Sequence, residues 1–194
     1  MSDEISATPH AMTRLAVASG MPFAEFRRQF EAAAPTFDAP GVRELIARGG
    51  GWQDIEAAAE RNAPYGLMIY AVIDIGQLMT AAGHTVRCVE YLLGNHVTAE
   101  RMFRHDPAVA LYAPLRVTIH SDPGDHAIIT FDQPSSVFAG LGNPQITEVG
   151  TELDHTVAEL LRAITGRAAG PALAQPNHQL LRKGNDCVYL RRTS

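Results

Sequence analysis

The chain has 194 residues, a mass of 21.0 kDa and a formal net charge of -5. With 46% hydrophobic and 19% charged residues, it can build its own core without disulfides or a structural metal, and wholesale disorder is excluded. No apolar run reaches the roughly 18–20 residues that span a bilayer, and no basic run indicates a nucleic-acid surface, so we expect neither a membrane nor a nucleic acid as partner.

The amino-terminal residues are acidic and polar, whereas a secretory signal would begin basic and continue apolar. We therefore expect a cytoplasmic protein with a flexible tail over residues 1–11. The two cysteines, Cys88 and Cys187, lie far apart and form no CxxC unit, so we interpret both as buried thiols of a reducing compartment.

The first predicted element is a strand over 14–19, where Leu15 and Val17 alternate with polar or small residues. A helix should begin at Pro22, a residue favoured at the first helical position, because Phe23, Phe26 and Phe30 recur on one helical face. Residues 35–66 then form an irregular helical insert, with short helices over 42–47 and 54–62 separated by three glycines.

Two apolar segments, 67–75 and 85–93, predict the next strands. Asn95 should cap a helix that runs to about residue 104. Strands over 115–120 and 127–131 flank a strong turn signal and form a hairpin, and the apolar stripe of 147–164 predicts the last long helix. Beyond it lie a linker over 166–176 and a possible extra strand over 186–191.

This order of elements predicts a single α+β domain over residues 12–165. Its antiparallel-rich sheet should have helices packed on one face. Residues 166–194 are expected to be a carboxy-terminal linker with the possible extra strand.

A set of short motifs resembles a known family. The motifs are Gly66–Asp74 (GLMIYAVID), Leu92–Asn95 (LLGN), Asp106-Pro107, Ala113–Val117 (APLRV) and Phe131–Pro134 (FDQP). In order and spacing they resemble the bacterial family called domain of unknown function 302, over roughly residues 14–164. The resemblance implies a TATA-binding-protein-like β-α-ββββ-α architecture and a homodimer, and it implies no established activity. Two features depart from the family pattern: His96 stands where a proline is usual, and the insert is longer.

The first candidate site is Gly94-Asn95-His96, at the predicted start of a helix where free N–H groups favour an anion. His96 and Glu100 are four residues apart, so they share a helix face and can ligate a metal or form an acid–base pair. The alternative interpretation is a capped helix with a surface His–Glu pair.

The second candidate is the hairpin. With an odd number of loop residues, such as 121–125, His120 and His126 lie directly opposite each other and can share a metal. Zinc usually requires a third protein ligand, and the residues considered for that position are Glu90 and His96. The alternative is a pair of exposed hairpin histidines.

The third candidate is one face of the sheet. Arg116, Thr118 and His120 project from the same side of their strand, and Arg14 and Arg87 are expected to join them. Several arginines on one face suit a small anionic molecule or a polar dimer interface.

The leading functional hypothesis is a small-molecule-binding or interaction domain that is a homodimer without demonstrated catalysis. Its ligand would be small and anionic or polar, near Asn95, His96, Glu100, Arg116 and His120. The alternative is an enzyme that uses His96, Glu100 and His120 for acid–base or metal-assisted chemistry. A third hypothesis places haem or another hydrophobic cofactor in a cavity under the helices; the sequence identifies no cofactor.

Overall fold

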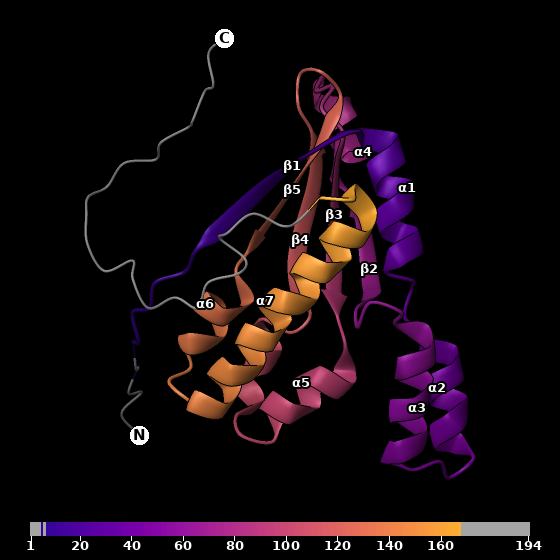
Figure 1. The fold of residues 1–194 in the computed structure, drawn as a ribbon, viewed down its shortest axis with the longest axis vertical. Coiled ribbons are helices and arrows are strands. Elements are labelled where there is room, and N and C mark those ends of the chain that lie inside the picture. Colours follow the sequence, from indigo (N-terminus) through magenta and orange to yellow (C-terminus); the bar gives the residue numbers. More distant parts are fainter. Residues whose placement is uncertain (1–4, 6, 168–194) are drawn as a thin grey trace.

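The computed structural model describes residue 5 and residues 7–167 (Figure 1). The predicted strand over 186–191 and nearly all of the predicted linker lie outside the described residues. In chain order the elements are β1 (Arg14–Pro22), α1 (Phe23–Ala33), α2 (Ala39–Ala47), α3 (Trp52–Asn62), β2 (Met68–Asp74), α4 (Ile75–Met79), β3 (Cys88–Gly94), α5 (His96–Phe103), β4 (Leu115–Ser121), β5 (His126–Asp132), α6 (Pro134–Ala139) and α7 (Pro144–Thr165).

The five strands form one antiparallel sheet in the order β1-β5-β4-β3-β2, so β1 and β2 are its edges. This confirms the predicted α+β class with an antiparallel sheet. The likeness to the TATA-binding-protein architecture stays a prediction.

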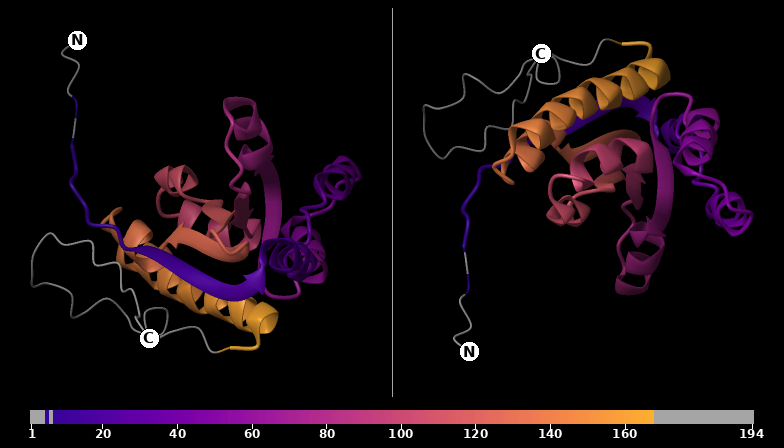
Figure 2. Two further views of the ribbon diagram at one scale, coloured as in Figure 1. Left: turned by 90° about the horizontal axis from the view of Figure 1, so that it is seen from above. Right: turned by 90° about the horizontal axis from the view of Figure 1, so that it is seen from below.

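Helices α1 and α7 cover one face of the sheet, and α7 runs diagonally across the strands (Figures 1 and 2). The three phenylalanines of α1 are buried as the spacing predicts, and Phe30 lies against Tyr91 of β3 at a ring-centroid distance of 5.1 Å. The apolar stripe of α7 completes this core with Val149, Leu153, Val157, Leu160, Leu161 and Ile164. Burying these side chains removes a large apolar area from water, which is the main force that holds the helices on the sheet.

The other face of the sheet is more open. It carries the alternate residues of each strand, among them Thr118 of β4, Thr130 of β5 and the exposed Arg116. These residues point away from the core because successive side chains of a strand alternate between faces. The homodimer that the resemblance implies, for which this face is a candidate surface, stays a prediction.

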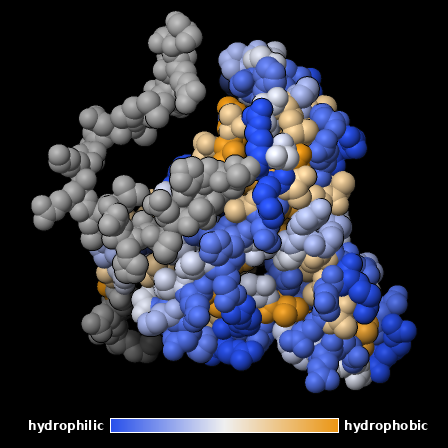
Figure 3. All heavy atoms as spheres, viewed as in Figure 1, coloured by the Kyte–Doolittle hydropathy of each residue, from blue (hydrophilic) through white to orange (hydrophobic). Residues whose placement is uncertain are grey.

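The segment 35–66 holds the helical pair α2 and α3, which projects from one end of the sheet beyond α1 (Figure 1). It meets the rest of the protein through a small second cluster in which Ala59, Ala63 and Met68 are buried. None of the nine residues of α2 is buried, and α3 buries only Ala59. In a space-filling view the outer surface over α7, α1 and this pair is mainly hydrophilic (Figure 3).

Several element boundaries differ from the predictions by a few residues, and the end of β2 has a visible cause. The Asp74 side chain accepts a hydrogen bond from the Gln77 backbone N–H and so caps a helix. Strand β2 therefore ends at Asp74, and Ile75 begins α4 although it continues the apolar run. Strand β3 begins at Cys88 rather than at residue 85. The short helices α4 and α6 were not predicted, because five or six residues are too few to show a helical period.

No helix within residues 7–167 has the combination of length and apolar character that crossing a membrane requires.

A buried carboxylate joins α7 to the start of α6. Asp154 is only 3% exposed, and its two oxygens accept hydrogen bonds from the Gln133 side-chain amide (2.9 Å) and from the Ser135 backbone N–H (3.0 Å). Because both donors are buried, they depend on this carboxylate for partners.

We therefore expect Asp154→Ala to lower the free energy of unfolding by about 2–4 kcal/mol, since it leaves two buried donors unpaired. Urea denaturation followed by circular dichroism measures this. The matched control is His155→Ala, the next residue on α7, whose side chain is exposed. A loss for Asp154→Ala no larger than for His155→Ala would contradict the role assigned to this carboxylate.

Candidate functional site

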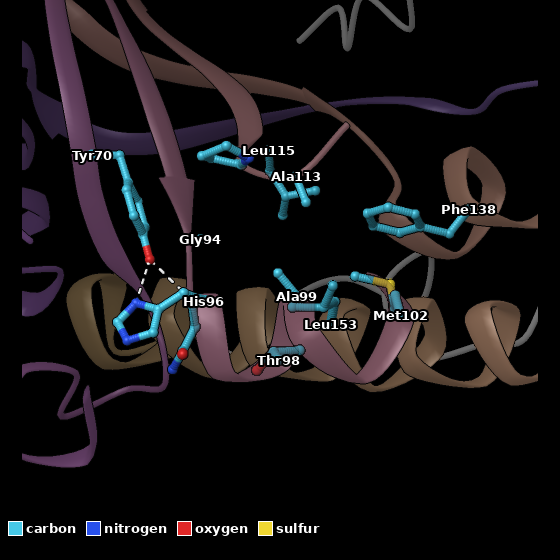
Figure 4. Close-up of a pocket in the computed structure, with 12 residues that line it drawn as sticks. Tyr70, Gly94, His96, Thr98, Ala99, Met102, Ala113, Leu115, Phe138 and Leu153 are labelled. Carbon is cyan, nitrogen blue, oxygen red and sulfur yellow. Dashed lines mark hydrogen bonds between the residues drawn. The ribbon is translucent and has the colours of Figure 1, made fainter. Parts of the chain in front are cut away.

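A cavity of about 110 Å³ lies between α5, the end of the sheet and the helices α6 and α7 (Figure 4). Half-exposed lining residues such as Ala99 and Ala113 connect it to the surface. Its lining residues come from six elements and the segment before β4: Tyr70, Gly94, Asn95, His96, Thr98, Ala99, Met102, Ala113, Pro114, Leu115, Phe138 and Leu153.

The walls of this cavity are mainly apolar. Met102, Phe138 and Leu153 face Ala113 and Leu115 across it, as Figure 4 shows. Among the residues that the structure describes, none of those lining it carries a formal charge apart from the titratable His96. The polar side chains Tyr70, Asn95, His96 and Thr98 belong to the start of α5 and the neighbouring strand.

Asn95 caps α5 as the sequence predicts. Its Oδ1 accepts a hydrogen bond from the Val97 backbone N–H at 2.9 Å, which satisfies one of the free donors at the helix start. Its Nδ2 donates to the Gly66 carbonyl at 3.0 Å and so ties the helix to the turn before β2. Among the described residues no partner takes the second hydrogen of this amide, so it can be donated to a ligand.

Tyr70 reaches the same helix start from a bulge in β2. The pairing of β2 with β3 shifts between Ile69 and Ala71, so Tyr70 is an extra residue outside the regular ladder. Phe37 stacks on its ring with the centroids 4.6 Å apart. The Tyr70 ring packs with Met68 in the small second cluster, whereas Ile69 between them faces the main core.

Two hydrogen bonds join Tyr70 to His96. The Tyr70 oxygen accepts from the His96 backbone N–H at 3.0 Å and lies 2.8 Å from His96 Nδ1 (Figure 4). Since that oxygen already accepts one hydrogen bond, its own O–H proton is best placed to donate to Nδ1. A neutral imidazole that accepts at Nδ1 carries its proton on Nε2. We infer that His96 Nε2 is the protonated nitrogen.

Burial shifts the pKa values of both partners. It lowers the pKa of His96 below the ordinary value of 6.5, because the charged imidazolium is poorly solvated there. It raises the pKa of the Tyr70 phenol to about 12, although the hydrogen bond from the His96 backbone acts in the opposite direction. At neutral pH both side chains are therefore uncharged. His96 Nε2 is buried and has no hydrogen-bond partner among the described residues.

His96 also borders a second cavity, of about 210 Å³, under the helical pair α2 and α3. This cavity is lined by Phe37, Asp38, Gly41, Val42, Ala58, Ala59, Arg61, Asn62, Met68 and His96. The imidazole therefore stands between two cavities, one mainly apolar and one bearing charged side chains.

The structure brings together Gly94, Asn95 and His96 of the first candidate site around one cavity and separates the other predicted site residues from them. Glu100 forms an ion pair with Arg104 on α5 and does not line the first cavity. Arg116 pairs with Glu90 at 2.8 Å on the open face of the sheet. His120 lies on that face opposite Cys88 and Ile128. The three side chains of the enzyme hypothesis, His96, Glu100 and His120, thus do not line one cavity.

The arginines expected beside Arg116 are also engaged in ion pairs. Arg14 lies 2.9 Å from Asp132, and Arg87 lies 3.1 Å from Asp125. These contacts neutralise the positive charge that the sequence suggested for an anionic ligand on this face, and exposed pairs of this kind contribute little to stability.

The prediction that His120 and His126 lie opposite each other is wrong. Ser121 pairs with Ala127, so His120 pairs with Ile128 and the loop is centred on Gly124. The cause is Asp122, whose Oδ1 accepts the backbone N–H groups of Gly124 and His126, both at 2.8 Å. Within the described part of the chain, no cluster of three or more His, Cys, Asp or Glu residues is arranged to hold a metal.

Sequence reasoning missed Tyr70 and Phe37, and it missed the apolar walls that Met102, Phe138 and Leu153 provide. Tyr70 belongs to a nearly continuous apolar run, in which nothing marks its contact with the start of α5. The apolar wall residues look like ordinary core positions, because a cavity depends on how elements meet rather than on any one residue.

The lowered pKa of His96 leads to a prediction about stability. Below about pH 6.5 the unfolded chain takes up a proton at this residue while the folded chain resists it, so the free energy of unfolding falls as the pH falls. We expect His96→Gln to lose less stability than the wild type between pH 7.5 and pH 5.5.

Urea denaturation of wild type and variant at the two pH values measures the free energy of unfolding. Other titrating groups contribute equally to both proteins where the substitution leaves their titration unchanged, so the difference between the two proteins reports on His96. An identical pH dependence in wild type and variant would show that His96 titrates alike in the folded and unfolded chains.

Comparison with known proteins connects this geometry to a family. The crystal structure of an uncharacterized conserved protein DUF302 from Bacillus stearothermophilus is similar to this chain, with a TM-score of 0.54 and 13% sequence identity. The match covers 82% of this chain and 100% of that chain. At this identity the likeness shows the fold alone. No curated protein matches the chain.

A family model described as "Domain of unknown function DUF302" matches residues 52–164. The match begins later than the resemblance suggested, at α3. It includes β2 to β5, the cavity-lining helices α5 and α6, and α7 up to residue 164. It covers more than half of the 194 residues. The resemblance seen in the sequence is thereby confirmed, and the chain belongs to the DUF302 family.

Proposed function

We propose that this protein binds a small neutral molecule in the cavity beside α5, with the apolar part of the ligand between Met102, Phe138 and Leu153. The observation that carries the proposal is a surface-connected cavity with apolar walls and a few polar side chains from one helix start. This combination is the usual character of a small-molecule site.

The size of the cavity limits the ligand. About 110 Å³ is somewhat less than the roughly 150 Å³ of an apolar protein cavity known to admit benzene. The ligand body should therefore have about six non-hydrogen atoms, with its polar end directed toward the opening. A haem would not fit in this space, so the cofactor hypothesis gains no support from the cavity.

The lining also favours a neutral ligand over the anionic one considered from the sequence. Burying an unpaired charge among Met102, Phe138 and Leu153 would cost several kcal/mol. The available polar groups are the free amide hydrogen of Asn95 and the hydroxyl of Thr98, which suit an oxygen that accepts or donates a hydrogen bond. A hydroxyl or carbonyl on an apolar ring meets these conditions.

Phenol is a suitable probe, because it joins a six-membered apolar ring to one hydroxyl. We expect phenol to shift the backbone amide resonances of Ala99, Met102 and Leu153 saturably in NMR titrations of the full chain. For so few atoms the dissociation constant should be about 1 mM.

Ala99→Leu should weaken phenol binding at least fivefold, because the larger side chain occupies the cavity. The control is Ala32→Leu, an exposed position of α1 that lines neither cavity. The proposal fails if phenol causes no saturable shifts at 10 mM, or if both variants bind it as the wild type does.

A further inference from the structure

We propose that the cavity under α2 and α3 is a second binding site, for a small carboxylate with an apolar body. In this site the carboxylate would accept a hydrogen bond from His96 Nε2–H and pair with the guanidinium of Arg61. This site is distinct from the cavity of the proposed function and takes a ligand of different charge.

The first supporting observation is the unpaired nitrogen of His96. Tyr70 occupies Nδ1, and in the tautomer inferred above Nε2 carries the proton and is a donor. Nε2 is buried without a partner among the described residues, and leaving a buried donor unpaired is costly. Figure 4 shows the imidazole pointing away from Met102 and Phe138, so its free nitrogen does not face the apolar cavity.

The second observation is Arg61 in the last turn of α3. It lines the same cavity as His96, and none of the ion pairs among the described residues involves it. A guanidinium has a planar array of donors that matches a carboxylate. By contrast, the Asn62 amide beside it already donates to the Thr36 carbonyl at 3.0 Å.

The charges around the cavity select a monoanion. Asp38 also lines it, and its Oδ1 accepts the Gly41 backbone N–H at 3.0 Å as the cap of α2. Arg61 and Asp38 are the two ionised side chains of the lining, since His96 is neutral. One ligand charge can pair with Arg61, whereas a phosphate dianion would add a second charge near Asp38.

The remaining walls suit an apolar body. Phe37, Val42, Ala58 and Met68 line the cavity, and Phe37 lies against the His96 ring with the centroids 5.3 Å apart. A volume of about 210 Å³ exceeds the roughly 150 Å³ that admits benzene, so a ring bearing one carboxylate fits.

A ligand reaches Nε2 only if the helical pair shifts, because this nitrogen has no contact with solvent. The pair is suited to such a shift. It buries no residue of α2 and only Ala59 of α3, so few apolar contacts oppose a small movement.

Benzoate is the probe, and NMR titration of the full chain is the measurement. We expect saturable shifts of the Val42, Ala58 and Asn62 backbone amides. Arg61→Gln and His96→Gln should each raise the dissociation constant about tenfold. Benzamide, which has the same shape without the charge, should bind at least tenfold more weakly than benzoate. The matched control is Arg43→Gln, an exposed arginine of α2 outside the lining, which should bind benzoate like the wild type.

The proposal is overturned if benzoate causes no saturable shifts, if Arg61→Gln binds it unchanged, or if benzamide binds equally well. Because Arg61 is exposed, Arg61→Gln should fold even if His96→Gln does not. Ala99→Leu separates the two sites: it should leave benzoate binding intact. Loss of benzoate binding in Ala99→Leu would place the anion in the first cavity and overturn this proposal, whereas failure of phenol to bind would bear only on the first site.

Discussion

The hydrogen bonds between Tyr70 and His96 are the junction on which the site depends. They tie the bulge of the edge strand β2 to the first residue of α5, and both cavities border this junction. A proline at position 96, as the family resemblance suggests for most members, has no backbone N–H to donate and no ring nitrogen to accept. Histidine at this position therefore forms both hydrogen bonds with Tyr70, and its Nε2–H remains as a buried donor without a partner among the described residues.

The same junction gives the two cavities different chemistry. On the α5 side the walls come from the main core, which is packed by α7 against the sheet and has no charge to offer a ligand. On the other side much of the wall comes from α2 and α3, and the lining includes Asp38, the cap of α2, and Arg61, in the last turn of α3. At His96 the well-packed wall of the first cavity therefore meets the loosely attached helices α2 and α3 of the second. The two proposed sites differ in the charge of their lining, and only the second requires the helices to move for binding.

Much of the fold was predictable because it depends on local patterns. The phenylalanine spacing of α1 and the apolar stripe of α7 each follow a helical period, and Asn95 carries the expected cap. The hairpin was predicted, but not its register, because the side chain of Asp122 organises the turn through two backbone N–H groups. The site was predictable only at Gly94, Asn95 and His96. Its other members depend on contacts between elements distant in sequence, such as that of Tyr70 with α5, which no local pattern reveals.

The central claim is that Tyr70 donates to His96 Nδ1 and leaves a proton on Nε2. Long-range ¹H–¹⁵N NMR correlations of the imidazole distinguish the two neutral tautomers and the charged ring. At pH 7.5 we expect the neutral ring with its proton on Nε2, and in Tyr70→Phe we expect this tautomer to lose its preference. A neutral ring protonated on Nδ1, or an imidazolium, in the wild-type protein would contradict the account.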